Sequence, residues 1–117
     1  MVSSIHNNAS ALQAFTQQMN TSANNLANVE TDGFKSSRTY NVGGCPQGVD
    51  TVTIQSKQPG PKVEDTTKSD GSVKELSNTD IAEEMVQQIQ AQNGFEANIA
   101  PIRTMDQMKG TLLDIIA

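Results

Sequence analysis

Aromatic side chains are scarce in this chain of 117 residues: they make up 3% of it, with no tryptophan, one tyrosine and three phenylalanines. Hydrophobic residues of all kinds reach 35%. Because large apolar side chains fill protein interiors, this composition supports only a thin core. The length is that of a single domain. We therefore expect one domain, in which the apolar residues gathered toward the two ends carry the folding information.

Cysteine is almost absent, since Cys45 is the only one. A single thiol excludes an intrachain disulfide, a thiolate metal cluster and a CxxC redox pair. The sequence also has no apolar run approaching the roughly 20 residues that cross a bilayer, and it shows no basic stretch followed by an apolar leader. We expect neither membrane insertion nor a cleavable signal peptide.

Clustered positive charge is missing as well. The net charge is −5, and the eight Lys and Arg residues are scattered along the chain. A nucleic-acid surface needs such residues grouped against phosphates, so nucleic acid is excluded as a partner. Acidic residues gather near the end, where six of them stand against two basic residues from Thr79 onward.

What is present is a heptad pattern in the first thirty residues. Apolar residues recur every seven positions, and two more occupy the adjacent d-type positions: Ile5, Leu12, Met19 and Leu26, then Phe15 and Val29. This spacing predicts a helix with a narrow coiled-coil seam. We expect the helix to end near Asn28, because asparagine tolerates left-handed backbone geometry and the next residues, 31–33, read as a turn.

The middle of the chain is punctuated by glycine and proline, at 43–44, 59–61 and 70–71. Helices do not run through such sequence. The β-branched stretch 49–54 and the segment 72–76 predict short strands. We expect residues 35–77 to form a small projection of short strands or an extended arm.

A second helix is predicted from Asp80, which can cap the first turn while Glu83 reaches back to the cap amide and Glu84 complements the helix dipole. An apolar stripe follows at helical spacing and includes Met85, Ile89, Phe95, Ile99, Ile102, Leu112, Leu113 and Ile116. Gly94 and Pro101 interrupt the good helix formers, so a kink is expected around residues 97–101.

Two separated segments resemble flagellar rod and hook proteins. The first, residues 23–35, is similar to their N-terminal signature, with Asn-Leu-Ala-Asn followed by Thr-x-Gly-Phe-Lys. The second, residues 81–86 and 91–98, resembles their C-terminal helix. The resemblance covers residues 3–40 and 77–117. The signature positions are Asn25, Leu26, Ala27, Asn28, Thr31, Gly33, Phe34 and Lys35.

The resemblance implies a mainly α fold with a small β or irregular middle. Residues 1–34 and 78–117 would pair as a coiled-coil hairpin, and residues 35–77 would lie between them. It further implies a structural subunit of the basal-body rod, self-assembling through its terminal helices into a drive shaft and export channel. Its partners would be copies of itself, other rod and hook proteins, and the type III export apparatus that delivers it to the periplasm. The short middle suits a proximal-rod-like or reduced distal-rod-like member.

No cofactor, metal or catalytic group is expected. His6 has neither a nucleophile nor an orienting carboxylate nearby, adjacent Glu83 and Glu84 diverge on a helix, and Cys45 lacks a basic neighbour. The chain is therefore expected not to be an enzyme. The alternative is a soluble helical binding module that pairs with one partner helix and does not polymerise, which would sediment as a closed complex.

Overall fold

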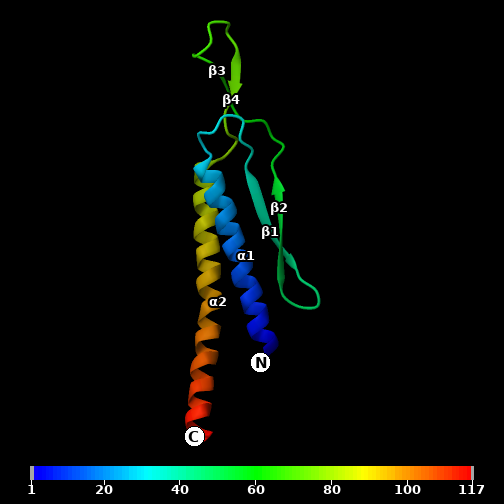
Figure 1. Ribbon diagram of the computed structural model, residues 1–117, viewed down its shortest axis with the longest axis vertical. Coiled ribbons are helices and arrows are strands. Elements are labelled where there is room, and N and C mark those ends of the chain that lie inside the picture. The colour runs from blue at the N-terminus through cyan, green and yellow to red at the C-terminus, as the bar shows by residue number, and fades with distance from the viewer. Residues whose placement is uncertain (1, 117) are drawn as a thin grey trace.

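The computed structural model describes residues 2–116 as an elongated molecule of 80 × 25 × 17 Å (Figure 1). Along the sequence, one long helix comes first, four short strands follow, and a second long helix comes last. In order they are α1 (Val2–Ala27), β1 (Ser37–Gly43), β2 (Val49–Gln55), β3 (Lys62–Glu64), β4 (Val73–Glu75) and α2 (Ile81–Ile116). The predicted fold class, mainly helical with a small β middle, is confirmed.

The two helices lie side by side and run in opposite directions, so that the chain leaves and returns at the same end (Figure 1). The radius of gyration is 21.0 Å, against about 13 Å for a compact domain of this length. The accessible surface is 8243 Å², where a compact chain of this mass exposes about 6,200 Å². Much surface is therefore left uncovered in the single chain.

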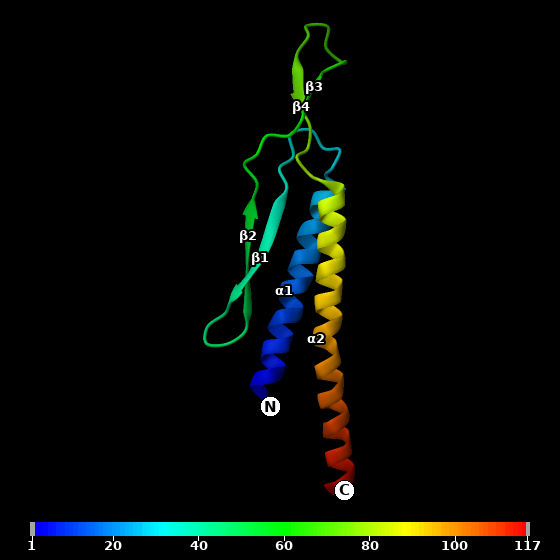
Figure 2. The ribbon, with the colours of Figure 1, turned by 180° about the vertical axis from the view of Figure 1, so that it is seen from behind.

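The strands form two separate antiparallel hairpins. The first, β1–β2, pairs Ser37 with Gln55 and Gly43 with Val49, and it folds back along α1 (Figure 2). The second, β3–β4, lies beyond the ends of both helices. Strands were predicted near 49–54 and 72–76 and are found there. Those at 37–43 and 62–64 were not predicted.

The helix ends are set by local hydrogen bonds. The α1 helix ends at Ala27, as predicted, but Asn28 does not adopt a left-handed conformation. Its side-chain amide instead donates to the Asn24 carbonyl at 2.9 Å, and Gly33 supplies the positive φ of 70°. At the other helix, Asp80 Oδ1 accepts the amides of Ala82 and Glu83, at 2.9 and 3.3 Å. The predicted cap is confirmed.

The kink predicted around residues 97–101 is wrong. The α2 helix continues through Gly94 and Pro101 without a sharp bend (Figures 1 and 2). Pro101 lies on the exposed side of the helix, and Ala97, whose carbonyl loses its usual donor there, is exposed as well. Water can therefore satisfy the freed carbonyl, which is why the helix tolerates the proline.

Candidate assembly surface

The contact between α1 and α2 is centred on small and polar side chains. Four residues of α1 are buried: Ala11, Ala14, Ser22 and Asn25. They meet Glu84 and Ala91, the buried residues of α2. Three of the four on α1 lie one position before a residue of the predicted apolar seam. The residues at the centre of the contact are therefore smaller and more polar than those of the predicted seam.

Asn25 is the largest fully buried side chain in the described residues, with 1% of its surface exposed. Its amide nitrogen donates to the Ser37 carbonyl at 2.6 Å and to Glu84 Oε1 at 3.0 Å, while its oxygen accepts the Ser37 backbone amide at 2.9 Å. One side chain of α1 thus binds both β1 and α2. Every polar atom of the amide group has a partner, as burial demands.

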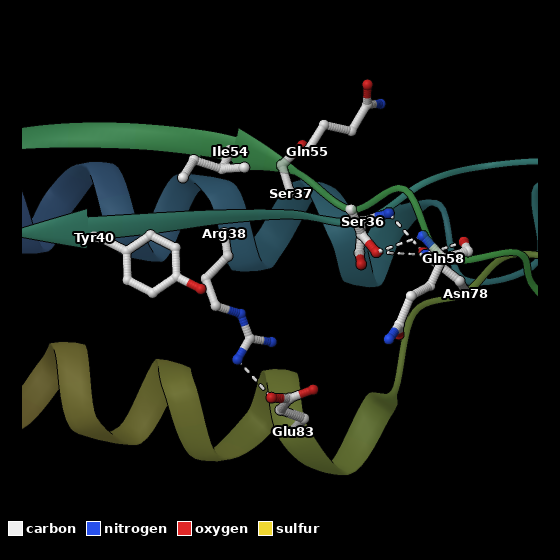
Figure 3. Close-up of a pocket in the computed structure, with 10 residues that line it drawn as sticks. Ser36, Ser37, Arg38, Tyr40, Ile54, Gln55, Gln58, Asn78 and Glu83 are labelled. Atoms are coloured by element: carbon white, nitrogen blue, oxygen red, sulfur yellow. Dashed lines mark hydrogen bonds and ion pairs between the residues drawn. The ribbon is translucent and has the colours of Figure 1, made fainter.

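Glu84 is buried as well, with 3% of its surface exposed, and it lies in the first turn of α2 as predicted, but its contacts with α1 were not predicted. It accepts the Asn25 bond, its backbone carbonyl accepts Ser22 Oγ at 3.0 Å, and Arg38 lies 3.9 Å from its carboxylate. Neighbouring Glu83 does not reach back to the helix cap. It binds Arg38 at 2.5 Å instead, and this hydrogen bond raises the pKa of Arg38 above its usual value (Figure 3). The first turn of α2 is therefore tied to β1.

Asn78 joins the strands to the start of α2. Its side-chain oxygen accepts the Ser36 amide at 2.7 Å, and its nitrogen donates to Ser56 Oγ at 3.1 Å and to the Gln58 carbonyl at 2.9 Å (Figure 3). Its own backbone amide donates to Phe34 at 3.2 Å. Three chain segments, 34–36, 56–58 and the one that leads into α2, therefore meet at Asn78, which was not predicted as a site residue.

The signature residues Gly33 and Lys35 hold the second hairpin. The Gly33 amide donates to the Glu75 carbonyl at 2.8 Å, and Lys35 forms an ion pair with the Glu75 carboxylate. That carboxylate also accepts the Gly60 amide at 2.7 Å. The hydrogen bonds from Lys35 and then Gly60 hold the pKa of Glu75 below its usual value. We refer to the hydrogen-bonded cluster built on Asn25, Asn78, Glu75 and Glu84 as the polar junction.

The predicted assembly residues fall into two groups. Eight are half-buried along the flanks of the helix pair: Ile5, Leu12, Phe15, Leu26, Val29, Phe95, Ile99 and Ile102. Six are exposed: Met19, Met85, Ile89, Leu112, Leu113 and Ile116. The structure thus partly buries the first group within one chain and leaves the second group exposed.

Phe15 explains the presence of Gly94 in α2. A Cβ atom at position 94 would lie 2.5 Å from two atoms of the Phe15 ring, so the ring rests directly on the glycine backbone. Glycine therefore costs helix propensity but permits close packing of α1 against α2 at this level. Its role is opposite to the helix interruption expected from the sequence.

Beyond the start of α1, helix α2 runs on alone. Ile5, near that start, lines a groove of about 300 Å³ with Ile102, Met105 and Lys109. With 26 and 36 residues, the helices differ in length by about 15 Å at the usual rise per residue. We call the last turns of α2, residues 110–116, the overhang. All its described residues are exposed, and four are large and aliphatic: Leu112, Leu113, Ile115 and Ile116.

The residues considered for chemistry do not converge. His6 and Cys45 are both exposed and lie on different elements, with Cys45 in the β1–β2 loop. Within residues 2–116, no group of three or more His, Cys, Asp or Glu side chains could hold a metal ion. Across the same range, neither helix combines the length and the apolar character needed to traverse a bilayer.

Two family models match the chain, one at each end. The model for the flagellar basal body rod FlgEFG protein C-terminal region matches residues 70–115, and the model for the flagella basal body rod protein matches residues 5–35. The chain belongs to the flagellar basal-body rod family. Both matches cover the helices, and together they span roughly two thirds of the sequence. No curated protein matches the chain.

Membership of the rod family identifies the chain as a structural component of the flagellar basal body, in a family that is not enzymatic. The resemblance read from the signature residues is confirmed. The two matched regions are the ones that Asn25 and Glu84 join, 59 positions apart in the sequence. The first hairpin, β1–β2, lies outside both matches.

Proposed function

We propose that the chain polymerises as a rod subunit, using its terminal helices to bind copies of itself and other rod or hook proteins. The resulting tube would transmit torque and enclose the export channel. Torque transmission requires a rigid link between the helices and the outer strands. The polar junction supplies such a link, because Asn25 hydrogen-bonds to both β1 and α2.

The observation that carries this proposal is the imbalance between buried and exposed apolar residues. In the described part of the chain the buried hydrophobic residues are three alanines, Ala11, Ala14 and Ala91, whereas large aliphatic side chains along α2 are exposed. Fully burying one such side chain contributes about 1.5–3 kcal/mol. Covering them with neighbouring helices would therefore stabilise the polymer more than anything available within one chain.

Export as an unfolded chain through the type III apparatus is part of the proposal. A thin core and a lone cysteine suit it, because little stabilisation opposes unfolding and no disulfide has to be broken. The subunit would then fold as it joins the growing rod in the periplasm. Its neighbours would cover the terminal helices, including the overhang.

Deletion of the encoding sequence, followed by motility assays and electron microscopy of isolated basal bodies, tests the rod assignment. We expect non-motile cells with truncated or missing rods, restored by the wild-type chain and not by one ending before residue 110. The truncated chain is the matched test of the overhang. Complete rods and normal swimming in the deletion strain, with any paralogue also removed, would contradict an essential axial role.

The second candidate, a binding module that does not polymerise, rests on Ile81, Met85 and Ile89. These exposed residues are one helical turn apart, which is the spacing at which a single partner helix docks. Analytical ultracentrifugation over rising concentration separates the two candidates. The rod proposal expects open-ended association, whereas a binding module gives a monomer or one closed complex.

A further inference from the structure

The β1–β2 hairpin turns its polar side toward α1. This is the reverse of the usual arrangement, in which a sheet packs its apolar side against a helix. Its side toward α1 is polar: Thr39 is buried and its hydroxyl lies 2.7 Å from that of Thr21, while Asn41 accepts a hydrogen bond from Gln18 at 3.1 Å. Thr53, paired with Thr39 across the hairpin, is bonded to it at 2.8 Å. A sheet with one solvated side ordinarily turns its apolar side inward.

Four apolar side chains lie on the other side of the hairpin, which also carries Arg38. Tyr40 stands opposite Val52 in the strand register, with one further apolar residue on the same side of each strand. All are between 41% and 57% exposed, and Figure 3 shows Tyr40 and Ile54 beside an open cavity of about 350 Å³. We call this set the hairpin face: Tyr40, Val42, Val52 and Ile54.

A second exposed apolar set lies on α2. Ile81, Met85 and Ile89 follow one another at single helical turns and are between 49% and 59% exposed. Glu83 marks the side of α2 that faces the hairpin, because it binds Arg38 of β1. Met85, two residues further, is rotated by about 200° around the helix axis. This set, the α2 stripe, therefore points away from the hairpin.

We propose that the hairpin face of one copy packs against the α2 stripe of a neighbouring copy. This inference rests on the proposed self-assembly and adds a lateral contact to the one made by the terminal helices. A sheet face and a helix ridge are complementary layers, and both are apolar here. Because the two surfaces differ, and the α2 stripe points away from the hairpin of its own chain, the contact is heterologous and each copy makes it twice, which generates an open-ended array.

The size of the two surfaces favours a second copy within a polymer over a free dimer. Each consists of three or four half-exposed side chains, the scale of a patch of a few hundred Å². A stable pairwise interface buries about 800 Å² per partner. One hairpin contact is therefore too small to hold two chains together alone, but it adds to the contacts of the terminal helices when many copies are aligned.

Site-directed cross-linking tests the contact on the full chain. In a Cys45→Ser background, Val52→Cys reports the hairpin face and Met85→Cys reports the α2 stripe. The chains are concentrated until they associate and then treated with a short bismaleimide. We expect the double variant to give a ladder of covalent oligomers, a mixture of the two single variants to give dimers alone, and each single variant by itself to give none.

The matched control replaces Val52→Cys by Thr66→Cys, which is exposed on the β3–β4 loop, in combination with Met85→Cys. A ladder equal to that of the test pair would mean random collision and overturn the proposal. So would dimers from either single variant, because they would show a symmetric contact. If the chains sediment as open-ended polymers but give no cross-linked ladder, this contact is overturned and the proposed self-assembly stands. Failure to associate under any condition would remove the proposed self-assembly and this contact with it.

Discussion

At the end of the helix pair nearest the strands, buried side chains are polar and hydrogen-bonded, whereas at the opposite end α2 extends past α1 with exposed aliphatic side chains. The polar junction satisfies its groups within one chain, so it defines how helices and hairpins are joined. The overhang has nothing within residues 2–116 to cover it. The comparison separates residues that build the subunit from residues available to other subunits.

Replacing Asn25 by Asp should give the largest loss of subunit stability. The change keeps the size of the side chain but removes the donor to Ser37 and Glu84 and places a second carboxylate beside Glu84. We expect the free energy of unfolding to fall by about 3 kcal/mol, the upper range for unsatisfied buried groups. Urea denaturation followed by circular dichroism measures it. A loss as small as that of a surface substitution would show that the junction is not structural.

Gly94→Ala should have the next largest effect on the free energy of unfolding. The matched change Gly110→Ala should have an effect of the opposite sign. At position 94 a methyl group meets the Phe15 ring, so overpacking should cost about 1–3 kcal/mol despite the gain in helix propensity. At Gly110, in the overhang, a Cβ atom meets nothing within 4 Å. Gly110→Ala should therefore stabilise by up to about 1 kcal/mol. Melting temperatures of both variants moving in the same direction would contradict the close packing of Phe15.

A smaller and local effect is expected from acidification near Glu75. The pKa of Glu75 is lowered in the folded chain by Lys35 and the Gly60 amide, so its contribution is complete above the unfolded value and is lost as pH falls below about 4.3. The protection factors of the Gly60 and Gly33 amides, which correct for the slower intrinsic exchange in acid, should fall there. In Lys35→Gln, exchange at these amides should already be faster at neutral pH and respond less to acid; an unchanged pH response would refute the link.

The smallest effect on the isolated subunit is expected in the overhang. Leu113→Gln replaces a residue that is 68% exposed, so the free energy of unfolding should change by less than about 0.5 kcal/mol. Open-ended association should nevertheless weaken strongly in sedimentation. Thr111→Gln, also exposed in the overhang, is the matched control and should associate normally. Equal association of both variants would remove the overhang from the interface.

The helices were predictable because their signals are local. A heptad period and the Asp80 cap fix their limits from neighbouring residues alone. The β1 strand was missed because polar residues at 37, 39 and 41 obscure the alternation, and they are buried or bonded through α1, which no local pattern reveals. Gly94 was misread for the same reason, since its partner Phe15 lies on the other helix.

The candidate surface was predictable in part. Searching for large apolar residues found the side chains that flank the helices but not the seam between them, where Asn25 and Glu84 meet. The polar residues Ser22 and Asn25, three positions apart in α1, were a signal for this seam that the prediction did not use. That the flanking residues bind other copies remains a prediction, because it concerns contacts between chains.

Asn25 binds β1 only through the backbone amide and carbonyl of Ser37. Such recognition ignores which side chain stands at that strand position. Position 37 can therefore change without loss of this contact, whereas Arg38, Thr39 and Asn41 are held by bonds of their own side chains to the two helices.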